Sequence, residues 1–268
     1  MGIMGRNGRL DTYLRDEKQQ RKVTAEHLFY NQNPENYPKE TKASVERSKI
    51  YTDEIHPRYG STPGKREVTV LDTDSVSVIF HFDLWQPDKK MALLSFADFN
   101  RPGGDFLQGA GDQEALLCLD SNLCNILKDE KFKAFYEENH GYTNNWLYAD
   151  RGLYIPDVAF VRSPVVLPAD VLSVTFPKKL DLVPAERNDA AVRSRIRYVL
   201  DMAEENGVDL LVLGAFGCGP FGQDPVKVAE AFRDCLMEEN YRFEKVIFPI
   251  FRDKASFESF KKVFDSTL

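Results

Sequence analysis

The sequence predicts a three-layer α/β/α domain, in which helices cover both faces of a central sheet. Short apolar runs alternate along the chain with segments whose apolar residues recur at the helical period. Two of these runs end in glycine-rich loops that continue into helices, within Leu94–Glu114 and at Gly214–Phe221. Loops at strand ends are where α/β proteins bind ligands, so the pair predicts a site for a phosphate-bearing molecule.

Composition limits the class of protein. The chain has 268 residues, enough for one large domain or a domain with an extension, and it is 43% hydrophobic and 29% charged, as expected for a soluble globular protein. A net charge of −7 argues against a broad nucleic-acid face. The apolar runs are too short to span a membrane. We therefore expect a cytoplasmic protein, with the nucleus as the alternative location.

Cysteine and histidine usage predicts neither a metal site nor a disulfide framework. The four cysteines contain no C-x-x-C pair, and the four histidines are scattered. This pattern is typical of a reducing compartment, and we expect the cysteines to be small core residues. Cys218 is the exception, because it lies in a glycine-rich loop.

The N-terminal part differs from the rest. Residues 1–66 are polar, with two candidate helices at Arg9–His27 and Thr41–Tyr51, and we interpret them as a helical extension that packs on the core. The main domain then covers 67–268.

Strands are predicted from short apolar runs. The predicted strands are Val68–Leu71, Met91–Phe96, Leu153–Ile155, Val158–Val161, Val171–Phe176, Leu210–Leu213 and Val246–Phe248. The run Val76–Phe82 is ambiguous, because its alternation favours a strand whereas the Asp/Ser cap before it favours a helix.

Helices are predicted from apolar stripes. Asp112 is a good N-cap for a helix with an apolar face at Leu116, Leu119, Leu123 and Leu127. Other helices are expected over Lys131–Asn139, from Asp189 to Gly207, after the Asp224-Pro225 cap, and around Phe257, Phe260 and Phe264.

The second glycine-rich loop, Gly214–Phe221, has the features of a diphosphate site. Gly217 and Gly219 permit a tight turn whose free backbone N–H groups can bind an anion, and Phe221 could stack on a sugar. The alternative is a tight strand-to-helix turn without a ligand.

The first glycine-rich loop adds carboxylates. Asp105, Asp112 and Glu114 lie within the loop and the start of the following helix, where they could orient sugar hydroxyls or activate water. Alternatively, Asp112 only caps the helix and Glu114 only complements its dipole. Neither role explains Asp105.

A set of motifs spread over most of the chain resembles one family. The motifs are Ser95-Phe96-Ala97, Pro102-Gly103-Gly104, Phe106-Leu107, Gly109-Ala110, Gln113-Glu114, Tyr154, Pro156-Asp157-Val158, Phe160, Arg162, Arg195-Ile196-Arg197 and Leu213–Gly219 with Phe221 and Asp224-Pro225. Together they resemble the microbial-type poly(ADP-ribose) glycohydrolase (PARG) family, a branch of the macrodomains.

The resemblance implies a macrodomain fold with a mixed central sheet and ADP-ribose as the ligand. The second loop would hold the diphosphate, Phe221 would pack on the distal ribose, and the first loop would surround that ribose. The ligand-binding residues expected from this assignment are Asp98, Asn100, Gly103, Gly104, Phe106, Gly217, Cys218, Gly219, Pro220 and Phe221. No cofactor or metal is implied.

The chain departs from the family where the chemistry takes place. The family sequence Asn-Pro-Gly-Gly-Gly is replaced by one that begins with Arg101 and ends with Asp105, and the catalytic second Glu of Gln-Glu-Glu is Ala115. Either catalysis is lost, or the acid has moved. Loss alone predicts neutral substitutions, whereas here aspartates appear at Asp105 and Asp112.

These observations predict a mono-ADP-ribosyl hydrolase that acts on modified protein side chains. Modified arginine is the first candidate substrate. Macrodomains similar to this family that carry aspartates in this loop are associated with that linkage, and paired carboxylates suit a cationic guanidinium. Asp105 and Asp112 would hold the leaving group or the water, and Glu114 would assist. The expected partners are ADP-ribose and ADP-ribosylated protein, without nucleic acid or membrane. The alternative is an inactive ADP-ribose reader.

Overall fold

The computed structural model describes residues 36–52, 54–59, 66–81, 86–141, 143–162 and 165–265. The predicted helix Arg9–His27 lies outside them. In chain order the elements are α3 (Pro38–Arg47), β1 (Lys49–Tyr51), β2 (Glu67–Leu71), α4 (Ser75–Ile79), β3 (Met91–Phe96), the 3-10 turn η1 (Phe106–Gln108), α5 (Gln113–Leu119), α6 (Leu123–Leu127), η2 (Glu130–Phe132), α7 (Lys133–Asn139), β4 (Gly152–Arg162), β5 (Val165–Val174), α8 (Ala185–Glu205), β6 (Leu210–Val212), α9 (Pro225–Glu238), β7 (Lys245–Pro249) and α10 (Lys254–Asp265).

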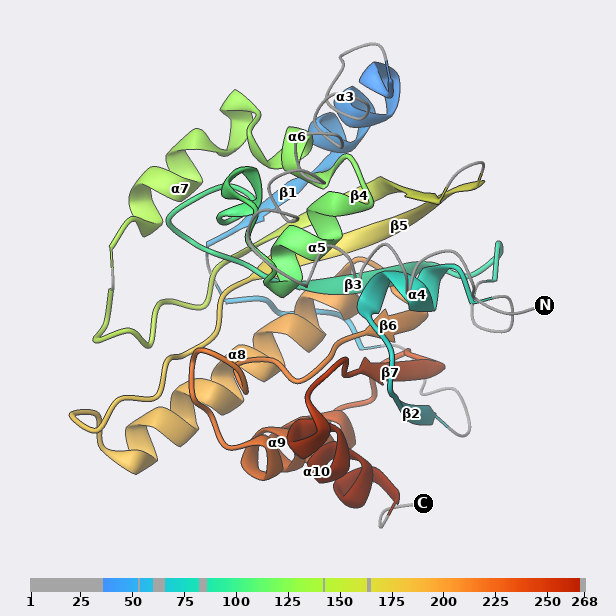
Figure 1. The fold of residues 1–268 in the computed structure, drawn as a ribbon. Coiled ribbons are helices and arrows are strands. Elements are labelled where there is room, and N and C mark those ends of the chain that lie inside the picture. The colour runs from blue at the N-terminus through green and yellow to red at the C-terminus, as the bar shows by residue number, and fades with distance from the viewer. Residues whose placement is uncertain are drawn as a thin grey trace.

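Seven strands of the described chain form one mixed sheet in the order β1-β4-β5-β3-β6-β7-β2 (Figure 1). From β5 to β2 neighbouring strands are parallel, whereas β4 is antiparallel to both β1 and β5. The central strand β3 is buried along nearly its whole length and has parallel neighbours on both sides. This arrangement confirms the predicted mixed central sheet.

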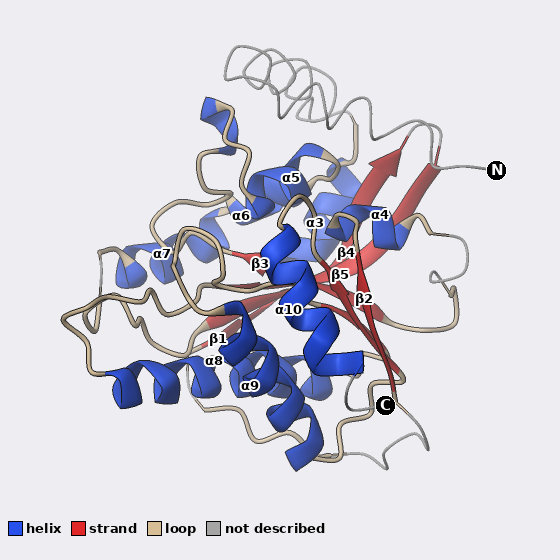
Figure 2. Cartoon of the chain, turned by 60° about the horizontal axis from the view of Figure 1, so that its bottom comes forward, coloured by secondary structure: helices blue, strands red, loops and turns tan. Residues whose placement is uncertain are grey.

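Helices cover both faces of the sheet, which confirms the three-layer fold (Figure 2). Alternate strand residues point into two separate cores, as the period of two requires. Leu93 of β3 packs with the helices α3 to α7 on one face. Leu94, the next residue, packs with α8, α9 and α10 on the other. Within the described residues no helix is both long and apolar enough to cross a bilayer.

The predicted single helix over Leu116–Leu127 is wrong, because α5 ends at Leu119 and α6 begins at Leu123. The residues between them bond to β4. The Asp120 carbonyl accepts the Val161 N–H at 2.7 Å, and Asn122 Oδ1 accepts the Ala159 N–H at 3.0 Å. These tertiary bonds replace the intrahelical bonds that the leucine period predicts.

The N-terminal helix prediction also needs correction. Helix α3 ends at Arg47, and Lys49–Tyr51 form β1, which pairs antiparallel with β4. The strand forms because β4 offers an unpaired edge at this point. Part of the predicted extension therefore belongs to the central sheet.

Three further expectations change in detail. The ambiguous run after Asp74 forms helix α4, because the Asp74 carboxylate accepts the Ser77 N–H. The two strands expected around Pro156-Asp157 are one strand, β4, with an irregular register between Ile155 and Val158. Strand β5 begins at Val165 and ends at Val174, earlier than predicted.

Candidate active site

A cavity of about 890 Å³ lies at the carboxyl ends of the parallel strands. Its walls are the turn after β2, the first loop after β3, the segment after β5, the second loop after β6 and the segment after β7, together with residues that precede β4. The lining residues are Thr73–Val76, Phe96–Arg101, Gly104, Asp105, Gly111–Glu114, Leu116, Leu117, Trp146, Tyr148, Thr175, Phe176, Ala215–Gly217, Gly219–Phe221 and Pro249–Asp253.

Two side chains at the start of α5 fix the end of β3. Gln113 Oε1 accepts the Phe96 N–H at 2.8 Å, and Gln113 Nε2 donates to the Leu94 carbonyl at 2.9 Å. Glu114 Oε2 accepts the Asp98 N–H at 3.0 Å. The first loop is thus tied at both ends to one strand and one helix, which holds its acids in fixed positions.

Glu114 is a buried acid on the cavity wall. Only 1% of its surface is exposed, and among the described atoms its Oε1 has no hydrogen-bond partner. Burial raises its pKa well above the usual range, although the hydrogen bond from the Asp98 N–H acts in the opposite direction. The carboxyl group therefore retains its proton at pH values where an exposed glutamate is ionised.

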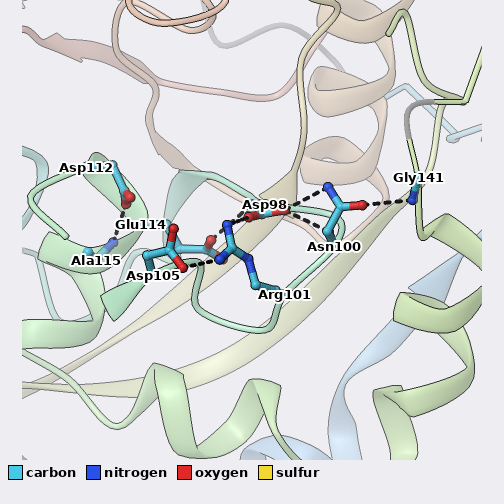
Figure 3. A network of polar contacts seen from close by, with 8 residues as sticks. All are labelled: Asp98, Asn100, Arg101, Asp105, Asp112, Glu114, Ala115 and Gly141. Atoms are coloured by element: carbon cyan, nitrogen blue, oxygen red, sulfur yellow. Dashed lines mark hydrogen bonds and ion pairs between the residues drawn. The ribbon is translucent and has the colours of Figure 1, made fainter. Parts of the chain in front are cut away.

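The first loop also holds an ion-pair network, shown in Figure 3. The guanidinium of Arg101 pairs with Asp105, and its Nη2 lies 3.3 Å from Asp98 Oδ2. Asp98 Oδ1 accepts the backbone and side-chain N–H groups of Asn100, at 2.7 and 3.1 Å. Asn100 Oδ1 accepts the Gly141 N–H at 2.8 Å, which links the loop to the segment after α7.

Asp112 lies at the cavity rim, where it caps α5. Its Oδ1 accepts the Ala115 N–H at 2.8 Å, as the capping interpretation predicts. Partial removal from water raises its pKa. Gly104, with φ +56°, lies between the acids, since a Cβ there would be 3.3 Å from Glu114 Oε2 and 3.8 Å from Asp112 Oδ2.

Ala115 belongs to the core. Its side chain is completely buried, and it is not among the described residues that line the cavity. The acid functions available at this end of the cavity are therefore the carboxyl groups of Asp98, Asp105, Asp112 and Glu114.

The conformation of the second loop strongly favours glycine at position 217. The φ of Gly217 is +79°, and a Cβ there would be 2.0 Å from the ring of Phe176. The Phe176 ring packs in turn on Phe216, with ring centroids 4.3 Å apart. This close contact places the loop backbone against the segment that follows β5.

Two aromatic rings form one side of the cavity. Tyr148 and Phe221 are stacked, with centroids 6.4 Å apart and planes inclined at 18°. The segment after β5 brings them together, because the Lys178 N–H bonds to the Trp146 carbonyl and the Lys179 N–H bonds to the Phe221 carbonyl, both at 2.9 Å. Such a pair can contact the apolar face of a sugar ring.

Most predicted site residues meet at the cavity, but three do not line it. Phe106 is fully buried, and a Cβ on Gly103 would point to the sulfurs of Cys124 and Cys118, at 3.3 and 3.4 Å. The Cys218 side chain also lies outside the lining, and burial raises its pKa to about 12. These positions can serve the site through the backbone or by supporting the loop.

The sequence interpretation missed other walls of the cavity. It assigned no ligand contact to Trp146, to Tyr148 or to the segments 73–76 and 250–253. From the sequence, Asp74 and Ser75 are predicted only to cap a helix. Their position after a predicted strand was the available signal. Within the described chain no three His, Cys, Asp or Glu side chains are placed to hold a metal ion.

Comparison with known proteins identifies the family. The sequence profile of the microbial-type PARG catalytic domain matches residues 18–163, more than half of the chain. The chain belongs to the microbial-type PARG family. No curated protein sequence matches it.

Solved structures agree with this assignment to the microbial-type PARG family. Poly(ADP-ribose) glycohydrolase from Thermomonospora curvata is 26% identical, with a TM-score of 0.82, over 92% of this chain and 100% of that chain. The same enzyme bound to the inhibitor ADP-HPD is 25% identical, with a TM-score of 0.78, over 91% and 99%. The enzyme from Deinococcus radiodurans in complex with ADP-ribose is 26% identical, with a TM-score of 0.73, over 85% and 98%.

Proposed function

We propose that this member of the microbial-type PARG family binds ADP-ribose and removes mono-ADP-ribose from modified protein side chains. The first candidate for the modified side chain is arginine. The observation that carries the proposal is the gathering of Asp98, Asp105, Asp112 and Glu114 at one end of a cavity whose other walls include the glycine-rich second loop. Relatives of this fold have been crystallised with ADP-ribose and with an inhibitor, which supports the same ligand here.

Each wall has a role in this proposal. The backbone N–H groups of the second loop bind the diphosphate, and Phe221 with Tyr148 packs on the distal ribose. Asp105 and Asp112 hold the guanidinium leaving group or orient a water molecule at the anomeric carbon. Glu114, whose raised pKa favours the protonated form, donates a hydrogen bond to the ribose and fixes the first loop.

The proposed reaction is a hydrolysis. The water oxygen forms a bond to the anomeric carbon while the bond from that carbon to the arginine nitrogen breaks, and the electron pair of that bond goes to the nitrogen. A carboxylate, Asp105 or Asp112, accepts the proton of the water and passes it to the departing neutral guanidine, which leaves as a guanidinium cation. No redox partner or metal is needed for the balance.

A second candidate, a reader that binds ADP-ribose without hydrolysis, is supported by the engagement of the acids. Asp112 is occupied as a helix cap, Asp105 is paired with Arg101, and Ala115 is buried at the position of the family glutamate. A reader would keep the cavity and lack an acid free to act on water.

One experiment distinguishes a hydrolase from a reader. The protein is incubated with arginine-linked mono-ADP-ribosylated protein, and the released ADP-ribose is measured. We expect release by the wild type and a loss of 100-fold or more in Asp105→Asn or Asp112→Asn, since a positioned acid or base contributes about that much. Asp88→Asn, at an exposed aspartate outside the cavity lining, is the matched control. ADP-ribose binding without release would favour the reader, and absence of binding would exclude both functions.

A further inference from the structure

The mouth of the cavity contains a guanidinium that belongs to the chain itself. Arg101 lies between Asp98 and Asp105 (Figure 3), and all three residues line the cavity. The Arg101 side chain is 57% exposed, so water screens both pairs and they contribute little to stability. A structural role in holding the fold therefore does not account for the arrangement.

We propose that Asp98 and Asp105 form a guanidinium-binding subsite, which Arg101 occupies in the free protein and vacates when the arginine side chain of a substrate enters. The inference rests on the proposed function and names the residues that would recognise the leaving group. Arg101 is then a specificity-determining residue, because it competes with the substrate for the same two carboxylates.

The carboxylates of the subsite are already positioned to bind a guanidinium in the free protein. Two N–H groups of Asn100 hold Asp98 Oδ1, and Gly141 holds Asn100 in turn, so Asp98 Oδ2 remains directed at Arg101. Two carboxylates at separate points match the planar fork of a guanidinium better than the compact ammonium of lysine. The geometry therefore favours arginine over lysine.

A separate observation points to a ligand at this place. Glu114 is 1% exposed and lines the same cavity, and its Oε1 has no hydrogen-bond partner among the described atoms. An unpaired buried carboxyl oxygen is unfavourable unless a group that enters the cavity pairs with it. Glu114 Oε2 and Asp98 Cβ flank the same face of Gly104, 3.3 and 3.9 Å from where its Cβ would be.

Displacement of Arg101 is feasible because the substrate is tethered. ADP-ribose bound in the cavity holds the attached guanidinium near the subsite at a high effective concentration. Arg101 is attached to the same loop and competes continuously, but its pairs are exposed and weak. Removal of Arg101 should therefore strengthen the binding of a guanidinium ligand.

The experiment measures agmatine, a small guanidinium compound, binding to protein saturated with ADP-ribose. We expect Arg101→Ala to bind agmatine about fivefold more tightly than the wild type, equivalent to about 1 kcal/mol. The affinity for ADP-ribose alone should stay the same or fall by less than twofold. Arg47→Ala is the matched control, because Arg47 is 52% exposed, pairs with Asp157 at 2.5 Å and does not line the cavity.

Further variants keep the test decisive. Arg101→Ala/Asp98→Asn should lose the gain in agmatine affinity, and thermal unfolding checks that each variant folds. Unchanged agmatine affinity in Arg101→Ala, or an equal loss of agmatine and ADP-ribose affinity, would overturn the inference. Agmatine binding requires no turnover, so the subsite is tested even if arginine-linked substrate is not hydrolysed.

Discussion

Glu114 combines two functions within one side chain. One carboxyl oxygen accepts the Asp98 N–H just after β3, and the other is buried without a hydrogen-bond partner among the described atoms. Because burial raises the pKa of Glu114, the protonated form, which can donate a hydrogen bond, persists to higher pH than in an exposed glutamate. The same property makes the stability of the fold dependent on pH.

Glu114→Gln should reduce that dependence. In the wild type the folded state keeps the Glu114 proton above the usual glutamate pKa, where the unfolded state has lost it, so stability falls as pH rises. Glutamine has no such proton and can still accept the Asp98 N–H. We expect the stability of the variant relative to wild type to rise by up to about 1.4 kcal/mol per pH unit as the pH increases above the usual glutamate pKa.

Urea unfolding at several pH values measures this difference. Glu46→Gln, at an exposed residue of α3, is the control and should follow the wild-type curve. Parallel curves for Glu114→Gln and wild type would contradict a raised Glu114 pKa.

Gly217→Ala should damage both stability and binding. The added Cβ would meet the Phe176 ring at 2.0 Å, and the left-handed φ is unfavourable for alanine. We expect a loss of about 3 kcal/mol from strain and overpacking together. Gly219→Ala is the matched control, since a Cβ there meets nothing within 4 Å. Equal stability of the two variants in urea unfolding would contradict the steric argument.

Neighbouring residues in the sequence are enough to predict the helix caps. They are not enough to predict the side chains that bond the first loop to β3. Asp112 and Asp224 cap the helices that directly follow them, so their roles can be deduced from neighbouring residues. Gln113 bonds to β3, whose bonded residues lie 17 and 19 positions earlier in the chain. A contact of that kind depends on how α5 packs on the sheet, which the sequence alone does not specify.

At the scale of elements, helix α8 supports the part of the cavity wall that contains Tyr148, although α8 packs on the opposite face of the sheet. Arg195 is 1% exposed, and its guanidinium donates to the Asp150 carboxylate and to the carbonyls of Leu147, Ala149 and Thr175. These bonds hold the segment before β4 against the end of β5. They fix the backbone on both sides of Tyr148.

Arg195→Met should therefore lower both stability and ligand affinity. Methionine fills much of the volume but leaves the buried carbonyls of Leu147 and Thr175 without the Arg195 donor, so we expect a loss of about 3 kcal/mol or more. Tyr148 loses its support, and affinity for ADP-ribose should fall about tenfold in the folded protein. Arg193→Met, at a half-exposed site two residues earlier in α8, is the control. Calorimetry with ADP-ribose and urea unfolding test both expectations.

The split between α5 and α6 shows why a helical period can mislead. Leucines at the helical spacing do face one core, as the sequence predicts. The intervening Asp120, Ser121 and Asn122 are all buried and bond with β4 or with the end of α5. Polar residues that break a helix by pairing with a distant strand leave no periodic signal.

In the whole molecule, the cavity lies at the carboxyl ends of the parallel strands, and the first described strand, β1, lies at the edge of the sheet opposite β2. Strands β3, β5, β6, β7 and β2 end at the cavity, whereas β1 pairs only with β4. The α/β/α order and the central strand could be predicted from apolar runs. The edge position of β1 could not, because three half-exposed residues carry no strand pattern.

Truncation before Thr52 should thus separate stability from binding. The variant loses α3 and β1, exposes the β4 edge, and removes the carbonyls of Val45, Glu46 and Ser48 that Lys131 binds. We expect a melting temperature lower by on the order of 10 °C. ADP-ribose affinity of the folded fraction should change by less than twofold. A comparable loss of affinity would mean that the N-terminal part acts on the cavity.

The pairing of β2 with β7 constrains when the site can form during synthesis. Strand β2 emerges early from the ribosome, yet its partner β7 is the last of the described strands along the chain. The turn after β2 forms one cavity wall, so that wall cannot be completed until translation has passed Pro249. Until then β2 remains an unpaired apolar segment, and long-range pairings of this kind slow folding and favour chaperone binding.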